Sequence, residues 1–385
     1  MNSLVKERIA TLGVFLANGF GIGAWAVEVP RIKESLLLSD ASLGLALFCF
    51  ALGAIVAMPL AGRLAPRFGS GRATALLGAA FAITLPLPAL APGMLTLCVV
   101  LFALGASNGA LDVSMNGHAS AIETRWHAPI MSSFHAAWSA GGLLGAATGA
   151  LLQKGGVGVV GGLLAPDLFI AVLIMFAAVL ALRDIGPRVT ATAGGSSSGF
   201  AWPDSGVMKL AMLAFLCMLV EGAVADWSAV YLRSTLSQEA SVAAIGYSAF
   251  AFSMAACRIA GDASVRRFGS SKVVALGGLI ALAGLTLVLS LPTVWTACVG
   301  FAMVGIGLAN IVPVIFSAAG RSTATPAIGV SMAATAGYAG FLIGPPLIGF
   351  GAGFLGLRIA LCVLVMATLI VSLLGGKAVR STQLA

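Results

Sequence analysis

The chain has 385 residues, of which 59% are hydrophobic and 9% are charged, and its mean hydropathy is +1.06. So few charged residues cannot cover the surface of a water-soluble protein of this length, which excludes a soluble globular protein. The formal net charge of +8 does not indicate a nucleic-acid partner, because the sequence has no basic soluble domain with interleaved aromatic residues.

Apolar segments long enough to cross a bilayer follow one another along the chain. A helix needs about 20 apolar residues to span the hydrocarbon core, and alternating ten-residue blocks typical of a β-barrel are absent. The sequence therefore predicts an all-α membrane protein. We predict twelve transmembrane helices, at 7–29, 41–62, 73–92, 93–118, 130–152, 163–182, 208–232, 242–263, 273–291, 293–319, 327–350 and 357–376.

The first predicted helix contains polar residues that a lipid-facing helix does not need. Asn18 and Trp25 are seven residues apart, so they share a face on which an aromatic ring is able to stack on a ligand. Glu28 fits either this wall or an interfacial belt. The segment is too long for a secretory signal, and we expect a retained helix.

A basic turn joins the second and third predicted helices. It reads RFGSGR at 67–72, and RFGSSK returns at 267–272, after an interval of 200 positions. Gly105 and Gly305 match at the same interval. Such an interval is too long for a solenoid and indicates two parallel six-helix halves.

The fourth predicted helix carries a polar stripe. Asn108, Asp112 and Asn116 recur at intervals of four, which places them on one face. We interpret the stripe as a cavity wall, and the alternative is a structural network of interhelical hydrogen bonds. An ionised side chain at the centre of a membrane helix costs about 2.5–3.5 kcal/mol, and this segment has no Lys or Arg. Asp112 is therefore predicted to exchange a proton.

The three histidines are scattered. His135 lies about one turn into the fifth predicted helix, where it is either a packing residue or a proton relay, because imidazole exchanges protons near neutral pH. His118 and His127 are expected to be solvated near helix ends. With no HExxH or CxxC pattern, the sequence predicts no metal site, and the six cysteines are expected to be packing residues.

The longest polar connection lies near the middle of the chain and is rich in Gly and Ser, which is typical of a flexible linker. We predict an N-terminal six-helix bundle at 1–182, a cytoplasmic linker at 183–207 and a C-terminal six-helix bundle at 208–385.

The second half has its own intramembrane charges. Glu221 and Asp226 are five residues apart, about 140° around an ideal helix, so they should not both face one cavity. Arg258 is the one basic residue expected inside the membrane, and Asp262 lies one turn from it. These two residues form a candidate gate pair, or an ion pair that only neutralises Arg258.

Two later helices contain helix-breaking residues. Asn310 and Pro313 in the tenth predicted helix, and Pro345 and Pro346 in the eleventh, predict bends where freed carbonyls need new partners.

Most of the 21 Lys and Arg residues fall on one side when both termini are placed in the cytoplasm. This asymmetry predicts a multi-pass protein of the cytoplasmic (inner) membrane with both termini inside. Topology and contact with anionic membrane lipid then explain the net charge.

The stretch GRLAPRFGSGR, at 62–72, resembles the loop signature of the major facilitator superfamily, with Pro66 where the family has Asp. GDASVRRFGSSK, from 261 to 272, is a partial second copy. The resemblance implies two pseudo-symmetric six-helix bundles that work by alternating access, and a basic loop that braces the cytoplasmic gate. The candidate gate residues are Arg67, Arg72, Arg258, Asp262 and Arg267.

Two further stretches, at 110–123 and 129–142, resemble the YbjJ-like inner-membrane proteins, a branch near the fucose permease group. Asn116 and Phe134 match positions that face the sugar cavity in fucose permeases. However, no Pro-aromatic pair follows Asn116, and His135 replaces the cavity Asn, so sugar specificity is not implied. An exporter-like GxxxGPPxxG run lies in the eleventh predicted helix, but the fifth has no proline, which favours symport or uniport.

No nucleotide-binding loop or nucleophile elbow occurs in a soluble segment, so the sequence predicts neither an ATP-driven pump nor an enzyme, and no cofactor. We predict a monomeric transporter that takes up a small polar solute with protons, and the alternative is a proton-coupled exporter of a small amphipathic compound. The predicted proton-exchanging residues are Asp112, His135 and Glu221. The predicted substrate-binding residues are Asn18, Trp25, Asn108, Asn116, Asp226 and Asn310.

Overall fold

The computed structural model describes residues 3–180 and 205–381, and most of the predicted linker lies outside these ranges. Every regular element in the described residues is a helix. The elements are α1 (Ser3–Ser35), α2 (Asp40–Phe68), α3 (Ser70–Thr84), η1 (Leu87–Leu90), α4 (Met94–Trp126), α5 (Met131–Lys154), α6 (Val159–Leu180), α7 (Ser205–Val230), η2 (Tyr231–Thr235), α8 (Ala240–Ile259), α9 (Gly261–Phe268), α10 (Ser270–Ser290), α11 (Val294–Leu308), α12 (Ile311–Arg321), α13 (Pro326–Leu355), α14 (Leu357–Ala360) and α15 (Cys362–Ser381).

Ten helical stretches of the described residues are long and apolar enough to cross a membrane. They confirm the prediction of an all-α membrane protein. The two predicted segments outside this set correspond to α5 and to α8, whose apolar part is Ile245–Ile259. The count of twelve crossings therefore stays a prediction.

The described residues form two compact units, which we treat separately. The first unit contains 3–127, 134–180 and the short segment 323–331. The second unit contains 128–133, 205–322 and 332–381. Two short segments are thus grouped with the unit that does not contain their neighbours in sequence.

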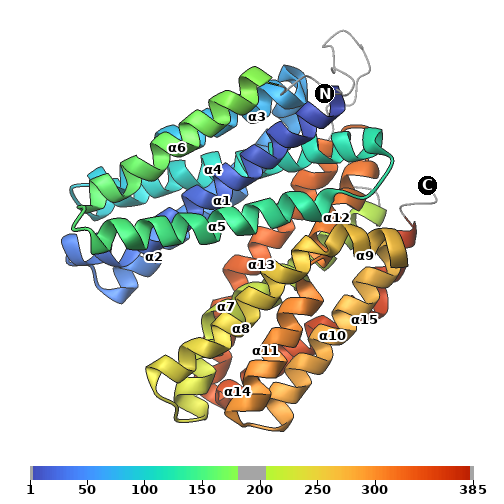
Figure 1. Ribbon diagram of the computed structural model, residues 1–385. Coiled ribbons are helices and arrows are strands. Elements are labelled where there is room, and N and C mark those ends of the chain that lie inside the picture. The colour runs from blue at the N-terminus through green and yellow to red at the C-terminus, as the bar shows by residue number, and fades with distance from the viewer. Residues whose placement is uncertain (1–2, 181–204, 382–385) are drawn as a thin grey trace. The chain divides into compact units, whose positions relative to one another are not determined.

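In the first unit, the helices α1 to α6 run alongside one another (Figure 1). α4 packs against α2 and α3, and α1 packs against α6. The contact between α4 and α2 depends on Gly105, because a Cβ atom there would collide with the carbonyl group of Phe50. Small residues allow this kind of close approach between membrane helices.

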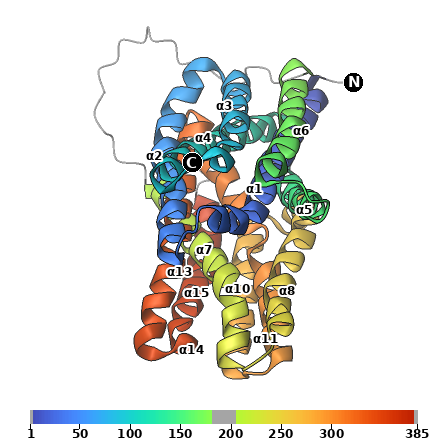
Figure 2. The same ribbon diagram turned by 90° about the vertical axis from the view of Figure 1, so that its left-hand side faces the viewer.

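The second unit repeats this contact. α11 packs between α8 and α10, and the three helices lie side by side (Figure 2). A Cβ atom on Gly305 of α11 would collide with the carbonyl group of Phe250 on α8. Both residues of the pair lie 200 positions after Gly105 and Phe50. The interval found in the sequence therefore also relates the helix contacts of the two units.

The two basic turns have the same backbone conformation. Gly69 separates α2 from α3 with φ 88° and ψ 139°. Gly269 separates α9 from α10 with φ 81° and ψ 149°. Glycine adopts these positive φ values without the steric cost that a Cβ atom would add, so each turn ends one helix and starts the next.

The predicted break in the tenth helix is present. α11 ends at Leu308 and α12 begins at Ile311, with Asn310 at φ −113° and ψ 1° between them. The Asn310 Nδ2 donates to the carbonyl oxygen of Cys257 at 3.1 Å. α13, in contrast, continues as one helix through Pro345 and Pro346.

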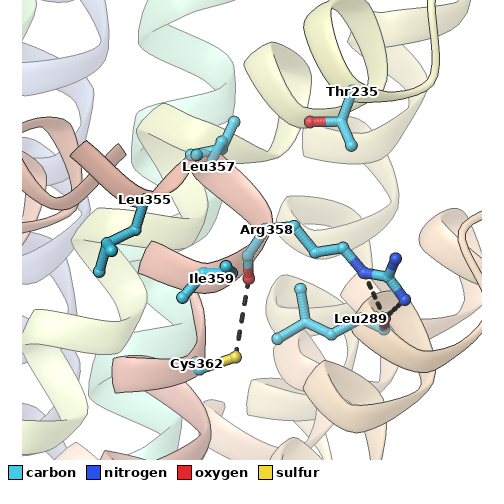
Figure 3. Close-up of a pocket in the computed structure, with 8 residues that line it drawn as sticks. Thr235, Leu289, Leu355, Leu357, Arg358, Ile359 and Cys362 are labelled. Atoms are coloured by element: carbon cyan, nitrogen blue, oxygen red, sulfur yellow. Dashed lines mark hydrogen bonds between the residues drawn. The ribbon is translucent and has the colours of Figure 1, made fainter. Parts of the chain in front are cut away.

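Side chains cap the C-terminal end of α10. Tyr231 Oη donates to the carbonyl oxygen of Val288 at 3.0 Å. Arg358 Nε and Nη2 donate to the carbonyl oxygen of Leu289 at 2.8 and 2.5 Å (Figure 3). The last carbonyl groups of a helix have no partner within that helix, and lipid offers none. These two side chains therefore stabilise the end of α10.

Candidate functional site

A chain of hydrogen bonds links α4 to α5 in the first unit. Asn116 Nδ2 donates to Asp112 Oδ1 at 3.1 Å and to the carbonyl oxygen of Asp112 at 2.9 Å. His135 Nε2 lies 3.2 Å from Asn116 Oδ1. Because an amide oxygen only accepts, the Nε2 atom carries the proton in this contact. The hydrogen bonds thus connect the predicted carboxyl group to the amide, and the amide to the imidazole.

A second chain of hydrogen bonds lies one helical turn earlier on α4. Asn18 Nδ2 of α1 donates to Asn108 Oδ1 at 2.8 Å. Trp138 Nε1 of α5 donates to Asn18 Oδ1 at 2.9 Å. Asn18 and Asn108 are both buried. Three helices therefore contribute to a single polar region, which we call the polar cluster: Asn18, Asn108, Asp112, Asn116, His135 and Trp138.

Aromatic rings hold the imidazole of the polar cluster. The His135 ring contacts the Phe15 ring edge-on, with centroids 5.7 Å apart. Phe134, which precedes His135 in sequence, stacks on the same Phe15 ring, with centroids 5.3 Å apart. Phe134 is fully buried. The Phe134 ring is therefore packed between α1 and α5 and does not contact solvent.

Asp112 has an unusual environment for an acid. Its Oδ2 atom is buried and has no hydrogen-bond partner among the described residues. The structure shows no ion pair for Asp112 within these residues, and its only side-chain contact to Oδ1 comes from a neutral amide. A buried carboxylate without a cation is costly. This geometry favours the protonated, neutral form of Asp112.

Other residues predicted to bind substrate lie outside the polar cluster. Trp25 is buried within α1, and Asp226 is exposed on α7. The Oδ1 atom of Asn310 is buried without a partner among the described residues. The substrate-binding roles of these three residues stay predictions.

The intramembrane base of the second unit binds an acid on another helix. Arg258 Nη2 lies 3.4 Å from Glu221 Oε1, and Arg258 Nε donates to the carbonyl oxygen of Ala309 at 3.3 Å. Both ionic side chains are largely buried. Glu221, which was predicted to exchange protons, thus has a cation beside it, unlike Asp112.

Asp262 binds the start of α5. Its two carboxylate oxygens each accept from the backbone N–H of Ser133, at 3.2 Å. Asp262 is buried, and Ser133 belongs to the short segment grouped with the second unit. A carboxylate is favourable at the N-terminus of a helix. Its predicted gate pair with Arg258 stays a prediction.

The remaining candidate gate residues lie at helix ends. Arg67 and Arg267 are exposed in the last turns of α2 and α9, and Arg72 is exposed in the first turn of α3. The guanidinium of Arg267 lies over the Phe268 ring at 5.4 Å. Their gating role stays a prediction.

The expectation that His118 is solvated was wrong, and the roles considered for Glu28 stay predictions. His118 is fully buried, not solvated, and its Nδ1 lies 2.8 Å from Ser70 Oγ. Glu28 is also fully buried, where it forms an ion pair with Arg31 at 3.1 Å and accepts from Gln153 Nε2 at 3.3 Å. Ser70 of α3 contacts the His118 Nδ1 atom. The Glu28 carboxylate contacts Arg31 of its own helix and Gln153 of α5, so each side chain has polar partners inside the protein.

The sequence analysis missed two residues. Trp138 belongs to the polar cluster, and its position three residues after His135 on one helix was an available signal. Asp167 lies within α6, and its Oδ1 is buried without a partner among the described residues.

Comparison with known proteins identifies the family of this chain. The sequence profile of the Major Facilitator Superfamily matches residues 11–261, more than half of the chain. The chain belongs to the major facilitator superfamily. An uncharacterised MFS-type transporter of Yersinia pestis is 35% identical over 357 residues, covering 92% of this chain and 91% of that protein. Membrane protein MosC of Rhizobium meliloti is 34% identical over 364 residues, covering 93% and 86%.

Solved structures of this superfamily have the same fold. The Escherichia coli fucose:proton symporter, FucP, aligns with a TM-score of 0.80 at 16% identity, and 99% of each chain is covered. The proton:xylose symporter XylE aligns with a TM-score of 0.77 at 13% identity, covering 98% of this chain and 96% of that one. The protein is therefore a multi-pass membrane transporter with the MFS fold.

Proposed function

We propose that this MFS protein takes up a small polar solute together with protons, by alternating access, and that Asp112 exchanges the proton. The observation that carries this proposal is the buried Asp112 Oδ2, which has neither a hydrogen-bond partner nor a cation among the described residues. We further propose that it acts as a monomer in the inner membrane, with both termini in the cytoplasm.

The polar cluster suits a small polar solute. Asn18, Asn116 and Trp138 provide amide and indole groups that bind hydroxyl, carbonyl or amine groups. A solute that enters would exchange hydrogen bonds with these side chains. Two of the structures with this fold are described as proton symporters, which supports proton coupling.

The hydrogen-bond chain indicates how proton and solute are coupled. An ionised Asp112 would be costly within the membrane, so the carrier is expected to change state only when Asp112 is neutral. His135 contacts Asn116, whose Nδ2 contacts Asp112. A solute that displaces Asn116 from this chain would therefore change the free energy of protonating Asp112, and this couples the two ligands.

The test uses proteoliposomes. A thermal-shift screen of the purified protein against sugars, organic acids, amino acids and nucleosides first identifies a solute that binds. Uptake of that radiolabelled solute is then followed under an imposed pH gradient, acidic outside. We expect accumulation in wild-type vesicles, loss of accumulation in Asp112→Asn, and retained counterflow exchange in Asp112→Asn, because the neutral amide still permits the change of state.

The control is Glu34→Gln, which removes an exposed acid of the same unit near the end of α1, outside the polar cluster. It should accumulate the solute as the wild type does. Accumulation by Asp112→Asn at the wild-type level would refute the assignment of Asp112. Solute release driven by the same gradient would instead support the exporter.

A further inference from the structure

A groove lies between α10 and α15 of the second unit. Its volume is about 500 Å³, and it is lined by Ser271, Ala275, Ser372, Leu373, Gly376, Lys377, Arg380 and Ser381. Ser271 Oγ of α10 donates to the backbone carbonyl oxygen of Gly376 of α15 at 2.7 Å, so this bond joins the two helices at the groove. The two helices therefore approach closely and leave a hollow above their small residues.

Two cations border this groove. Lys377 and Arg380 are exposed, and the structure shows no hydrogen bond or ion pair for either with another described residue. The hydroxyl groups of the lining are already committed, since Ser372 Oγ donates to the carbonyl oxygen of Ala275 and Ser381 Oγ to that of Ala378. The free donors of the groove are thus the two charged groups, which suits an anionic ligand.

An apolar surface continues from the groove along the helices. Leu373 lines the groove and is 61% exposed, and Leu279, one helical turn after the lining residue Ala275 on the same face of α10, is 51% exposed. Both residues belong to stretches that are long and apolar enough to span a membrane. A ligand that binds the cations is thereby placed against surface suited to acyl chains.

The hollow at the other end of α10 and α15 differs in this respect. It has a volume of about 590 Å³, and Arg358 is its basic lining residue (Figure 3). The Arg358 guanidinium already donates to the carbonyl oxygen of Leu289 through Nε and Nη2. The Arg358 guanidinium is thus bound to the end of α10, whereas the structure shows no such partner for Lys377 or Arg380 among the described residues, and these two side chains can bind a ligand.

We propose that the groove between α10 and α15 binds the phosphate headgroup of an anionic phospholipid, held by Lys377 and Arg380 with its acyl chains along Leu373 and Leu279. The positive-inside asymmetry places this end of the helices in the cytoplasmic leaflet. The binding energy comes from two charge-assisted contacts at a membrane surface together with acyl burial. This proposal does not depend on the transported solute.

The test is a lipid titration of the full-length protein, delipidated in detergent. Native mass spectrometry measures the binding of dioleoyl phosphatidylglycerol and of dioleoyl phosphatidylcholine, which share their acyl chains. We expect the wild type to prefer phosphatidylglycerol. The double variant Lys377→Gln/Arg380→Gln should bind it about thirtyfold more weakly, as expected for two basic contacts at an anionic lipid surface, and should bind phosphatidylcholine as the wild type does.

The control variant is Lys154→Gln, which removes an exposed lysine from the end of α5, outside the groove. It should bind both lipids as the wild type does. Equal affinity of the wild type for the two lipids would overturn the proposal, as would wild-type affinity in the double variant. Competition by soluble glycerophosphate at the same concentration as the lipid would show that the groove binds free phosphate and not a lipid.

Discussion

Single acidic residues inside the membrane are accommodated in two different ways in this protein. Glu221 lies beside the guanidinium of Arg258, so its negative charge is compensated. Asp112 has only the amide of Asn116 beside its Oδ1, and its Oδ2 has no partner among the described residues. The carboxyl group of the second unit therefore has a counter-charge, whereas the uncompensated carboxyl group of Asp112 is the one to which we assign proton exchange.

The ion pair of the second unit predicts a loss of stability when one partner is removed. Glu221→Gln removes the carboxylate that lies 3.4 Å from the Arg258 Nη2 atom in a largely buried position. Breaking a buried pair in this way costs about 3–5 kcal/mol. Thermal unfolding of the purified variant should therefore begin at a clearly lower temperature than that of the wild type.

The second variant is Glu221→Gln/Arg258→Met, which removes both charges. It should regain part of the lost stability, because the buried guanidinium is removed together with its carboxylate. A double variant no more stable than Glu221→Gln would contradict this explanation of the loss.

At the scale of elements, α4 uses three of its faces for different contacts. Gly105 faces α2, and Asn108 and Asp112 belong to the polar cluster shared with α1 and α5. The remaining face forms a ladder with α3. The pairs of this ladder are Thr84 with Ser107 at 2.7 Å, Thr74 with Ser114 at 3.0 Å, and Ser70 with His118 at 2.8 Å. Interhelical hydrogen bonds of this kind stabilise membrane helices, so α4 is held rigidly while it presents Asp112.

The face of α4 that contacts α2 predicts a strong effect of one methyl group. Gly105→Ala places a Cβ atom against the carbonyl group of Phe50, so the two helices have to separate. Overpacking of this kind costs about 1–3 kcal/mol. We expect a lower unfolding temperature in detergent and a lower yield of folded protein.

Gly44→Ala in α2 is the matched control, because a Cβ atom there meets nothing within 4 Å. It should be neutral or stabilise the protein by about 0.5–1 kcal/mol, since alanine favours the helix. A Gly105→Ala protein as stable as Gly44→Ala would contradict the close contact between α2 and α4.

At the scale of the whole molecule, the repeat at an interval of 200 positions and the distribution of Lys and Arg predict a topology. With both termini inside, a green fluorescent protein fused to the C-terminus should fluoresce, because this reporter folds in the cytoplasm. Alkaline phosphatase fused after Gly156, in the turn between α5 and α6, should be active, because this turn is expected outside.

The control exchanges the two reporter proteins between the two fusion positions. Alkaline phosphatase at the C-terminus should be inactive, and green fluorescent protein after Gly156 should be dark. The opposite pattern of activities would reverse the orientation, and activity of alkaline phosphatase at both positions would mean that the number of crossings between them is even.

The helical membrane architecture and the repeat that relates the two halves follow from the amino-acid sequence alone. About 20 apolar residues are required for each crossing, and the interval between the basic turns is visible without coordinates. The sequence also indicated part of the site, because Asn108, Asp112 and Asn116 lie on one helix, where a spacing of four defines a shared face.

The contacts between side chains of different helices could not be predicted from the sequence and are seen only in the folded protein. The contact of Trp138 with Asn18 joins residues 120 positions apart, and that of Arg258 with Glu221 joins residues 37 positions apart. His118 and Glu28 lie near the ends of predicted helices, but α4 continues to Trp126 and α1 to Ser35, so packing buries both side chains. Periodicity describes the faces of one helix, whereas the partner of each face depends on how close two backbones approach, and this is set by packing along the whole length of both helices.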